Sequence, residues 1–286
     1  MFWDKVPFSF LNSMSIIFSL CILLLPVFGH FIDATALSID QNGNIFVLDK
    51  GAHAFYKFSS RGDSLFAFGG KGWNTNQLDT PCDIWAKNGL DIFVADYNNH
   101  RIERFNRKLN YVGTLFTRDD ESSLARFGFP TSVVMNARGD VFVADGENKR
   151  IIRFSNFEHA KQSLGGYDAG KGKLRAPVQM ELDSLDRLYV LEKKRIVVFD
   201  TFGNFLSVIG EEQIQSATGF TVFGDDILVA NDGVMLLFSL DGRFIGEKKF
   251  ADFFTEVEAQ QIVDIAAVKN RIYFLTSTAV YFFEKK

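Results

Sequence analysis

The stretch PCDIWAKNGLDIFVADYNNHRIERFN, residues 81–106, decides the fold because it returns along the chain with small changes. Its clearest marker is an apolar run that ends in an acid, IFVAD at 92–96. Related runs are IFVLD at 45–49, VFVAD at 141–145, LYVLE at 188–192, ILVAN at 227–231 and IYFLT at 272–276. A phenylalanine follows each run: Phe58, Phe105, Phe154, Phe199, Phe238 and Phe283. Two markers that keep one period of about 45 residues predict six copies of one supersecondary unit.

Each copy contains four short strand signals separated by turns. In the second copy they lie at 82–87, 91–96, 101–106 and 111–117, with the hairpin turn Asn88-Gly89 after the first. The second strand is apolar on successive residues, which predicts burial on both of its faces. A β-sandwich would also have many strands but no fixed period. The sequence therefore predicts an all-β, six-bladed β-propeller with four-stranded antiparallel blades.

The residues of the second copy resemble the blade motif of the NHL-repeat family. The matching positions are Pro81, Asp83-Ile84, 92–96, Asn99-His100-Arg101-Ile102 and Phe105. The match is specific in the first four copies and weak in the last two. The resemblance implies a six-bladed propeller, and we expect the exported bacterial type. Similar proteins include RNA-binding regulators, protein-binding modules, sensor domains and an amidating lyase, so the resemblance implies no single function.

Two domains are predicted: an N-terminal segment at 1–29 and the propeller at 30–286. Residues 14–28 form an uncharged apolar run that is short for a membrane-spanning helix and suits a signal peptide. We expect cleavage after Gly29 and export to the periplasm, the cell surface or the medium. The alternative is an uncleaved anchor formed by residues 14–28, which would then be the chain's contact with a membrane.

The last copy has three predicted strands, at 261–268, 271–276 and 279–284, and no fourth before Lys286. An unpaired strand edge there would be an aggregation hazard. We therefore expect residues 25–31 to pair antiparallel with 279–284 and to complete the last blade. Cleavage after Gly29 would leave only a stub of this strand.

Composition limits the classes of partner. The net charge is −4 and the isoelectric point about 5.6, so the basic surface of a nucleic-acid-binding protein is missing. The two cysteines, Cys21 and Cys82, cannot build a disulfide framework. We expect a monomer that binds a protein, peptide or glycan and does not bind nucleic acid.

An acid and an arginine flank the same turn in three copies. The pairs are Asp96 and Arg101, Asp145 and Arg150, and Glu192 and Arg195. One interpretation is a charged binding rim. The interpretation we favour is a structural turn lock, in which the carboxylate accepts backbone N–H bonds and holds the arginine, because a binding site would not need repetition.

The first strand of each blade lines the central channel of a propeller, and one parity of its residues points inward. That parity places Asp83, Trp85, Gln179 and Glu181 at the channel mouth as candidate ligand-binding residues. Asp83 and Glu181 could hold a cation such as calcium. The competing interpretation is a water-filled polar channel with no cofactor or metal.

Two functions remain open from the sequence. The first is an exported, non-enzymatic binding module that presents a loop-rich face to its ligand. The second is a metal-dependent lyase or hydrolase of the amidating-lyase-like type, with its site in the channel. None of the four histidines, His30, His53, His100 and His159, lies on a predicted first strand. A catalytic zinc needs about three convergent ligands of this kind, so no catalytic residue is assigned.

Overall fold

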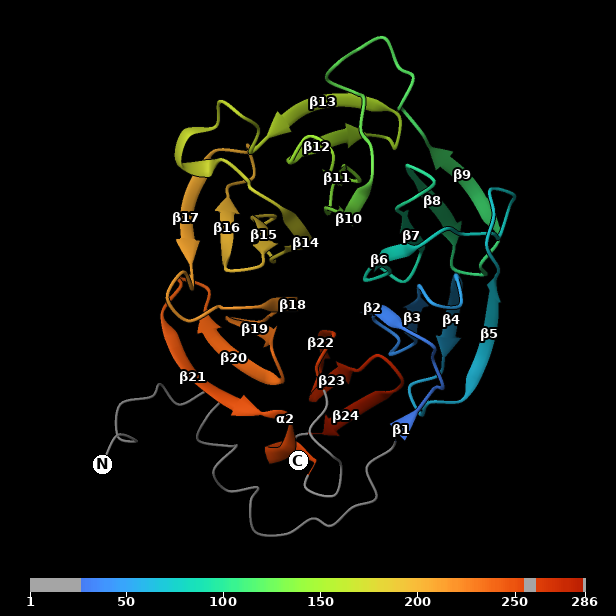
Figure 1. Cartoon of the computed structure of the whole chain (residues 1–286), viewed down its shortest axis with the longest axis vertical. Helices are drawn as coiled ribbons and strands as arrows, with labels where there is room; N and C mark the ends of the chain where they lie inside the picture. The colour runs from blue at the N-terminus through green and yellow to red at the C-terminus, as the bar shows by residue number, and fades with distance from the viewer. Residues whose placement is uncertain (1–26, 255–260, 285–286) are drawn as a thin grey trace.

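The computed structural model describes residues 27–254 and 261–284 and has six sheets arranged as a ring. Figure 1 shows the blades around a central axis, with the first strand of each blade innermost and the fourth at the rim. Every sheet has four antiparallel strands. The predicted fold class, a six-bladed β-propeller, is confirmed.

The first three blades follow one another along the chain. Blade one contains β2 (Ala34–Ile39), β3 (Ile45–Asp49), β4 (Ala54–Phe58) and β5 (Ser64–Gly69). Blade two contains β6 (Pro81–Trp85), β7 (Asp91–Asp96), β8 (Arg101–Asn106) and β9 (Tyr111–Leu115). Blade three contains β10 (Pro130–Met135), β11 (Val141–Asp145), β12 (Arg150–Ser155) and β13 (His159–Leu164).

The remaining blades carry two short helices in their connections. Blade four contains β14 (Pro177–Leu182), β15 (Leu188–Glu192), β16 (Arg195–Phe199) and β17 (Phe205–Ile209), preceded by the 3₁₀ turn η2 (Gly170–Gly172). Blade five contains β18 (Ala217–Phe223), β19 (Asp226–Asn231), β20 (Val234–Ser239) and β21 (Phe244–Lys249), followed by α2 (Phe250–Phe253). Blade six contains β22 (Asp264–Val268), β23 (Arg271–Leu275), β24 (Val280–Glu284) and β1 (Val27–Phe28).

The second strand of each blade is buried along nearly its whole length, as its continuous apolar sequence predicts. Every residue of β3, β11 and β15 is buried. The fourth strands, by contrast, are largely exposed at the rim, as in β5. A second strand is buried because it lies inside its sheet and contacts the sheets on both sides.

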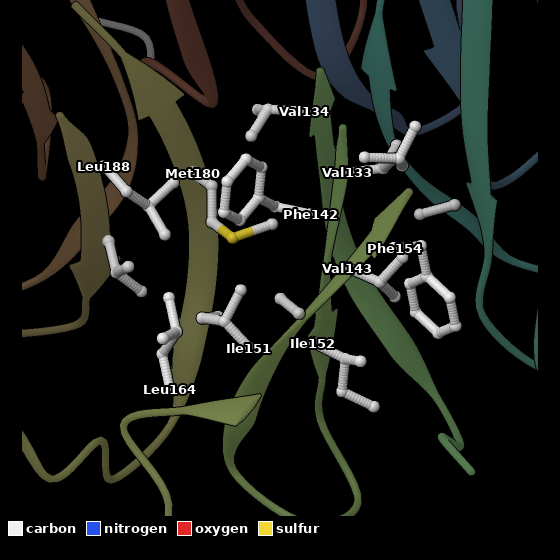
Figure 2. Close-up of a cluster of buried hydrophobic side chains, with 14 of the residues drawn as sticks. Val133, Val134, Phe142, Val143, Ile151, Ile152, Phe154, Leu164, Met180 and Leu188 are labelled. Carbon is white, nitrogen blue, oxygen red and sulfur yellow. The ribbon is translucent and has the colours of Figure 1, made fainter. Parts of the chain in front are cut away.

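The core consists of side chains packed between neighbouring blades. Figure 2 shows the layer between blades three and four, where Phe142, Ile151 and Leu164 lie opposite Met180 and Leu188. Burying a side chain of this kind stabilises the fold by about 1.5–3 kcal/mol. Since each layer needs both of its blades, the ring folds as one unit.

The N-terminal strand completes blade six, as predicted. Val27 pairs with Tyr281 and Phe28 pairs with Val280, antiparallel, and the Phe28 ring lies 5.1 Å from that of Phe58 in blade one. Among the described residues the strand ends at Phe28 and not at 31, because Gly29 adopts a φ of 81°, which ends the extended backbone. Residues 25 and 26 of the predicted range lie outside the described residues.

Two predicted first strands end or begin elsewhere. In blade two the strand runs from Pro81 to Trp85 instead of 82–87, because Pro81 already lies opposite Asp96 before a bulge at Cys82. In blade six the strand begins at Asp264 and not at 261. Strand ends and bulges of this kind are hard to locate from the sequence.

The predicted signal peptide or anchor falls mainly on residues 1–26, which lie outside the described residues. Only Val27 and Phe28 of the apolar run 14–28 are described, and they form β1. Within residues 27–254 and 261–284, no helix has the length and apolar character needed to cross a membrane.

Candidate functional site

Six equivalent positions, one from each first strand, form a layer around the central channel. Each lies opposite the fourth residue of the apolar run in the second strand, at Leu48, Ala95, Ala144, Leu191, Ala230 or Leu275. In chain order the six residues are Ala36, Asp83, Ser132, Gln179, Gly219 and Asp264. A small cavity in the channel is lined by the residues that stand two positions further along five of these strands: Ser38, Trp85, Val134, Glu181 and Thr221.

The polar members of the channel layer join neighbouring blades. Asp83 Oδ2 accepts the hydroxyl of Ser132 at 2.5 Å and the backbone N–H of Val133 at 3.0 Å. Ser132 Oγ in turn accepts the N–H of Met180 at 2.9 Å. Charge-assisted and buried hydrogen bonds of this type stabilise contacts that water cannot reach. The layer therefore stabilises the ring in addition to lining it.

The same pattern continues around the ring. Gln179 Oε1 accepts the N–H of Phe220 at 2.8 Å, and Asp264 Oδ2 accepts the N–H of Leu37 at 2.8 Å. The second of these joins blade six to blade one. Gln179 also reaches across the channel, with its amide nitrogen 3.2 Å from Asp264 Oδ1.

The four predicted channel residues, Asp83, Trp85, Gln179 and Glu181, thus line one cavity. Its volume is about 20 Å³, which is room for about one water molecule. Glu181 is paired with the ammonium group of Lys87 at 2.6 Å, and the Trp85 ring packs on Phe93 with centroids 5.9 Å apart. As described, the channel has no space for a peptide or a sugar.

Two residues of this cluster, Lys87 and Asp264, were missed from the sequence. Lys87 lies two residues after Trp85, the second predicted channel position of its strand, and its long side chain reaches Glu181 in blade four. Asp264 begins the run DIAA at 264–267, which matches DIWA at 83–86. This match could have identified Asp264 from the sequence. It was overlooked because the second-strand motif of the last blade, IYFLT at 272–276, is weak.

Burial controls the charge state of the channel acids. Burial, together with the neighbouring carboxylate of Glu181, raises the pKa of Asp83 to about 7 against the hydrogen bonds from Ser132 and Val133. Burial also raises the pKa of Asp264 well above its ordinary value and raises that of Glu181, where the pairing with Lys87 opposes the shift. The cluster therefore holds protons more tightly than free carboxyls do.

The side chains that could ligate a metal ion are not gathered at one place among the described residues. Among the described residues, no group of three or more His, Cys, Asp or Glu side chains is placed to hold a metal ion. His53 and His100 lie in equivalent turns, where Nδ1 accepts the N–H of Thr80 at 3.1 Å and of Phe129 at 3.0 Å. His30 and His159 are exposed. The described histidines therefore do not form the zinc site that an amidating-lyase-like enzyme would use.

The thiol of Cys82 takes part in a hydrogen bond between neighbouring blades. Thr35, Thr131 and Thr218 each donate a side-chain hydrogen bond to a carbonyl of the next blade, and the Cys82 thiol does the same toward Pro130, at 3.1 Å. Burial raises the pKa of this thiol well above its ordinary value. Thiolate is the reactive form, so the raised pKa disfavours reaction of the Cys82 thiol.

The acid and arginine pairs lie at the turns between second and third strands. Asp96 Oδ1 accepts the N–H of Asp79 at 2.7 Å, and its Oδ2 accepts Arg101 Nε at 2.9 Å. Asp145 accepts the N–H of Gly128 and Nε of Arg150. Glu192 accepts the N–H of Ala176 and Nε of Arg195. Each acid thus bonds both the loop that enters its blade and the arginine beyond its turn.

A hollow of about 890 Å³ lies on the loop-rich face, between blades three and four. Three segments form it: the β9–β10 loop, the β11–β12 turn and the β13–β14 loop. The residues that decide its character are Arg118, Arg126, Glu147, Arg150, Tyr167 and Asp168. We call it the loop-face groove. Sequence reasoning identified the loops and Arg150 but not the groove, because its shape depends on how the three segments pack.

Comparison with known proteins agrees with this architecture. The NHL repeat family model matches residues 127–154. A probable peptidyl-alpha-hydroxyglycine alpha-amidating lyase of Caenorhabditis elegans is 29% identical over 228 residues, covering 74% of this chain and 63% of the relative. The human NHL repeat-containing protein 3 is 27% identical over 156 residues, covering 46% and 44%. The chain thus spans less than two thirds of the length of these relatives.

Solved structures show the same fold at low identity. The virginiamycin B lyase of Staphylococcus aureus, in a catalytically inactive form with quinupristin, superimposes with a TM-score of 0.63 at 10% identity. The match covers 92% of this chain and 97% of that one. The repeated blade motif, the closed six-bladed ring and the family-model match within blade three together support a six-bladed β-propeller of the NHL-repeat type.

Proposed function

We propose that this protein is a non-enzymatic binding module whose ligand, a protein, peptide or glycan, occupies the loop-face groove. The single observation that carries the proposal is the contrast between the two hollows of the ring. The groove has about 890 Å³, within the range of ligand sites, whereas the channel has about 20 Å³. Loops on a rigid scaffold are the usual place for recognition.

The histidine beside the groove, His100, is held in place by its neighbours. Arg118 is held by Glu147 at 3.4 Å and lies 2.9 Å from Nδ1 of His100. Burial and the charge of Arg118 both lower the pKa of His100. Since Nδ1 also accepts the N–H of Phe129, this histidine is committed to its turn.

The experiment is a screen of a peptide array and a glycan array with purified protein. The test variant is Tyr167→Ala, because Tyr167 lines the groove and is 83% exposed, so its loss costs little stability. The matched control is Phe202→Ala, an aromatic residue 72% exposed in the β16–β17 turn, away from the groove. We expect ligands that bind the wild type and the control and lose affinity for Tyr167→Ala. Equal binding to all three proteins would refute the groove as the site.

The alternative function is a metal-dependent lyase or hydrolase with its site at the channel. It is favoured by one observation, the 29% identity to the probable amidating lyase. Asp83 and Glu181 would then be the candidate ligands for calcium or another cation. The assay is cleavage of a peptidyl-alpha-hydroxyglycine with added zinc or calcium, together with the metal content of the purified protein. Turnover that Glu181→Gln abolishes would establish this alternative over the binding module.

We also propose that the protein is exported through residues 1–29 or anchored by residues 14–28, works as a monomer and does not bind nucleic acid. Its net charge of −4 supports the last point. N-terminal sequencing of the protein from its host tests the first. A mature chain that begins near His30 would have lost β1, whereas one that begins before Val27 would keep it.

A further inference from the structure

Three arginines occupy the same position in consecutive blades, which allows them to be compared directly. Arg101, Arg150 and Arg195 begin β8, β12 and β16, and the Nε of each bonds its turn acid at 2.9, 3.0 and 2.7 Å. The Nη2 of each donates to carbonyl oxygens of the preceding loop. Up to this point the three guanidinium groups have the same surroundings.

They differ at Nη1. Arg101 Nη1 lies 2.9 Å from the carboxylate of Glu103, and Arg195 Nη1 lies 3.4 Å from that of Glu211. Arg150 Nη1 makes no hydrogen bond or ion pair to the residues in 27–254 and 261–284. Its side chain is also the most exposed of the three, at 17% against 5% and 9%.

The sequence explains the difference. Ile152 of blade three stands where Glu103 stands in blade two, one residue after the position shared by Ile102 and Ile151. Gly166 stands where Glu211 stands in blade four, two residues beyond the ends of β13 and β17. Blade three thus lacks both internal carboxylates. The loop-face groove opens at the place where one of them would lie.

We propose that the loop-face groove binds an acidic peptide, one of whose carboxylates pairs with Arg150 in the place that Glu211 takes beside Arg195. The proposal rests on the function proposed above and names its ligand. An arginine whose fork is partly free is a strong partner for a carboxylate. Arg126 is exposed at the same groove, and its guanidinium has no ion pair within the part of the chain that the structure describes.

The distribution of charge favours a peptide over a nucleic acid. A nucleic acid requires a continuous row of cations along its phosphates. The groove instead contains both signs of charge, with the acids Glu147 and Asp168 beside its three arginines, one of which, Arg118, is paired with Glu147. Separate carboxylates on a polar backbone fit such a mixture of charges. The exposed ring of Tyr167 adds an apolar surface for a neighbouring side chain.

The test restores the missing internal carboxylate. A Cβ built on Gly166 has as its nearest neighbour the Cβ of Arg150, at 4.0 Å, so a side chain fits there. Gly166→Glu should pair with Arg150 as Glu211 pairs with Arg195 and exclude the ligand. Gly166→Gln is the matched control, with the same size and no charge. Thermal unfolding of both variants checks that the ring remains folded.

The probes are a peptide array rich in Glu and Asp and a matched array in which every acid is replaced by its amide. Binding should be restricted to the acidic array and weaken about ten- to hundredfold in Gly166→Glu, as expected for one lost charge-assisted contact. Gly166→Gln should bind like the wild type, and Arg126→Gln should bind more weakly.

Three results would overturn the proposal. They are equal binding to the acidic and amide arrays, unchanged binding by Gly166→Glu, and selective binding of an oligouridine or a glycan in place of the acidic peptides. If such other ligands still depend on Tyr167, the acidic peptide is refuted and the binding module stands. If no ligand of any class depends on Tyr167 or Gly166, both proposals fail.

Discussion

Replacing Asp83 with Asn should remove a pH dependence from the stability of the ring. Burial, with the Glu181 carboxylate nearby, raises the pKa of Asp83 to about 7 in the folded protein, against about 3.9 for an unfolded chain. The folded state therefore binds this proton more tightly. Its contribution to stability is fully present below about pH 4, is lost as the pH rises to about 7, and changes no further above that.

The magnitude follows from the two pKa values. A difference of about three units corresponds to about 4 kcal/mol of stability lost between low and high pH. About 3 kcal/mol of this loss falls between pH 5 and pH 8.5. The asparagine oxygen can accept the bonds from Ser132 and Val133 that Asp83 Oδ2 accepts now, and it carries no charge. The advantage of Asp83→Asn over the wild type should therefore grow by about 3 kcal/mol across this range.

The assay is urea unfolding followed by tryptophan fluorescence at several pH values. The control is Asp200→Asn, in an exposed turn where hydrogen bonds from Asn204, opposed by slight burial, hold the pKa of Asp200 below its ordinary value. That group titrates below pH 5, so the control should follow the wild type. The difference between variant and wild type contains the titration of Asp83 together with its coupling to Glu181 and Asp264, whose pKa values the loss of the Asp83 charge also changes. If the Asp83→Asn and wild-type curves run parallel from pH 5 to pH 8.5, the account of the channel acids is wrong.

Three further substitutions test the packing of the ring. Cys82→Thr should change the unfolding free energy by less than about 1 kcal/mol, because a threonine hydroxyl can donate the same hydrogen bond. In the wild type, alkylation mapped by mass spectrometry should leave Cys82 unmodified, and rapid modification would contradict the raised pKa of its thiol. Gly219→Ala should lower the unfolding free energy by about 1–3 kcal/mol, because the new Cβ would come within 2.8 Å of the Asp264 backbone. In the control Gly246→Ala the new Cβ meets no atom within 4 Å, so equal melting temperatures of the two variants would exclude the clash. Phe28→Ala should lower the urea midpoint, with a loss of about 1–2 kcal/mol, since β1 closes blade six; an unchanged midpoint would mean that β1 contributes nothing.

The sequence predicted the fold well because the repeat averages over local errors. Six copies of one pattern locate the blades even where a bulge such as that at Cys82 shifts a strand end. Closure by β1 was also predictable, since a blade with three strands leaves an edge that needs a partner. Gly29, whose positive φ ends that strand, limited how well the range could be given.

The candidate site was less predictable because it depends on deviations from the repeat. Asp264 was missed since the weak last motif concealed the match of its strand to the one that contains Asp83. The groove was missed because its shape depends on how three loops pack, and because its partly free Arg150 depends on Gly166 standing where blade four has Glu211. A missing side chain has no pattern of its own. It becomes visible only when equivalent positions are superimposed in space.

The pairing of β1 with β24 has a consequence for synthesis on the ribosome. The two strands lie at opposite ends of the described chain, and the Leu37–Asp264 hydrogen bond spans 227 residues. At 5–20 residues per second, β1 remains without its partner for roughly 10–50 s after it is made. During that interval the nascent chain carries an open ring with two uncovered apolar faces. Closure of the ring thus requires both ends of the described chain, and a chain that stalls before blade six is expected to be a substrate for chaperones and proteases.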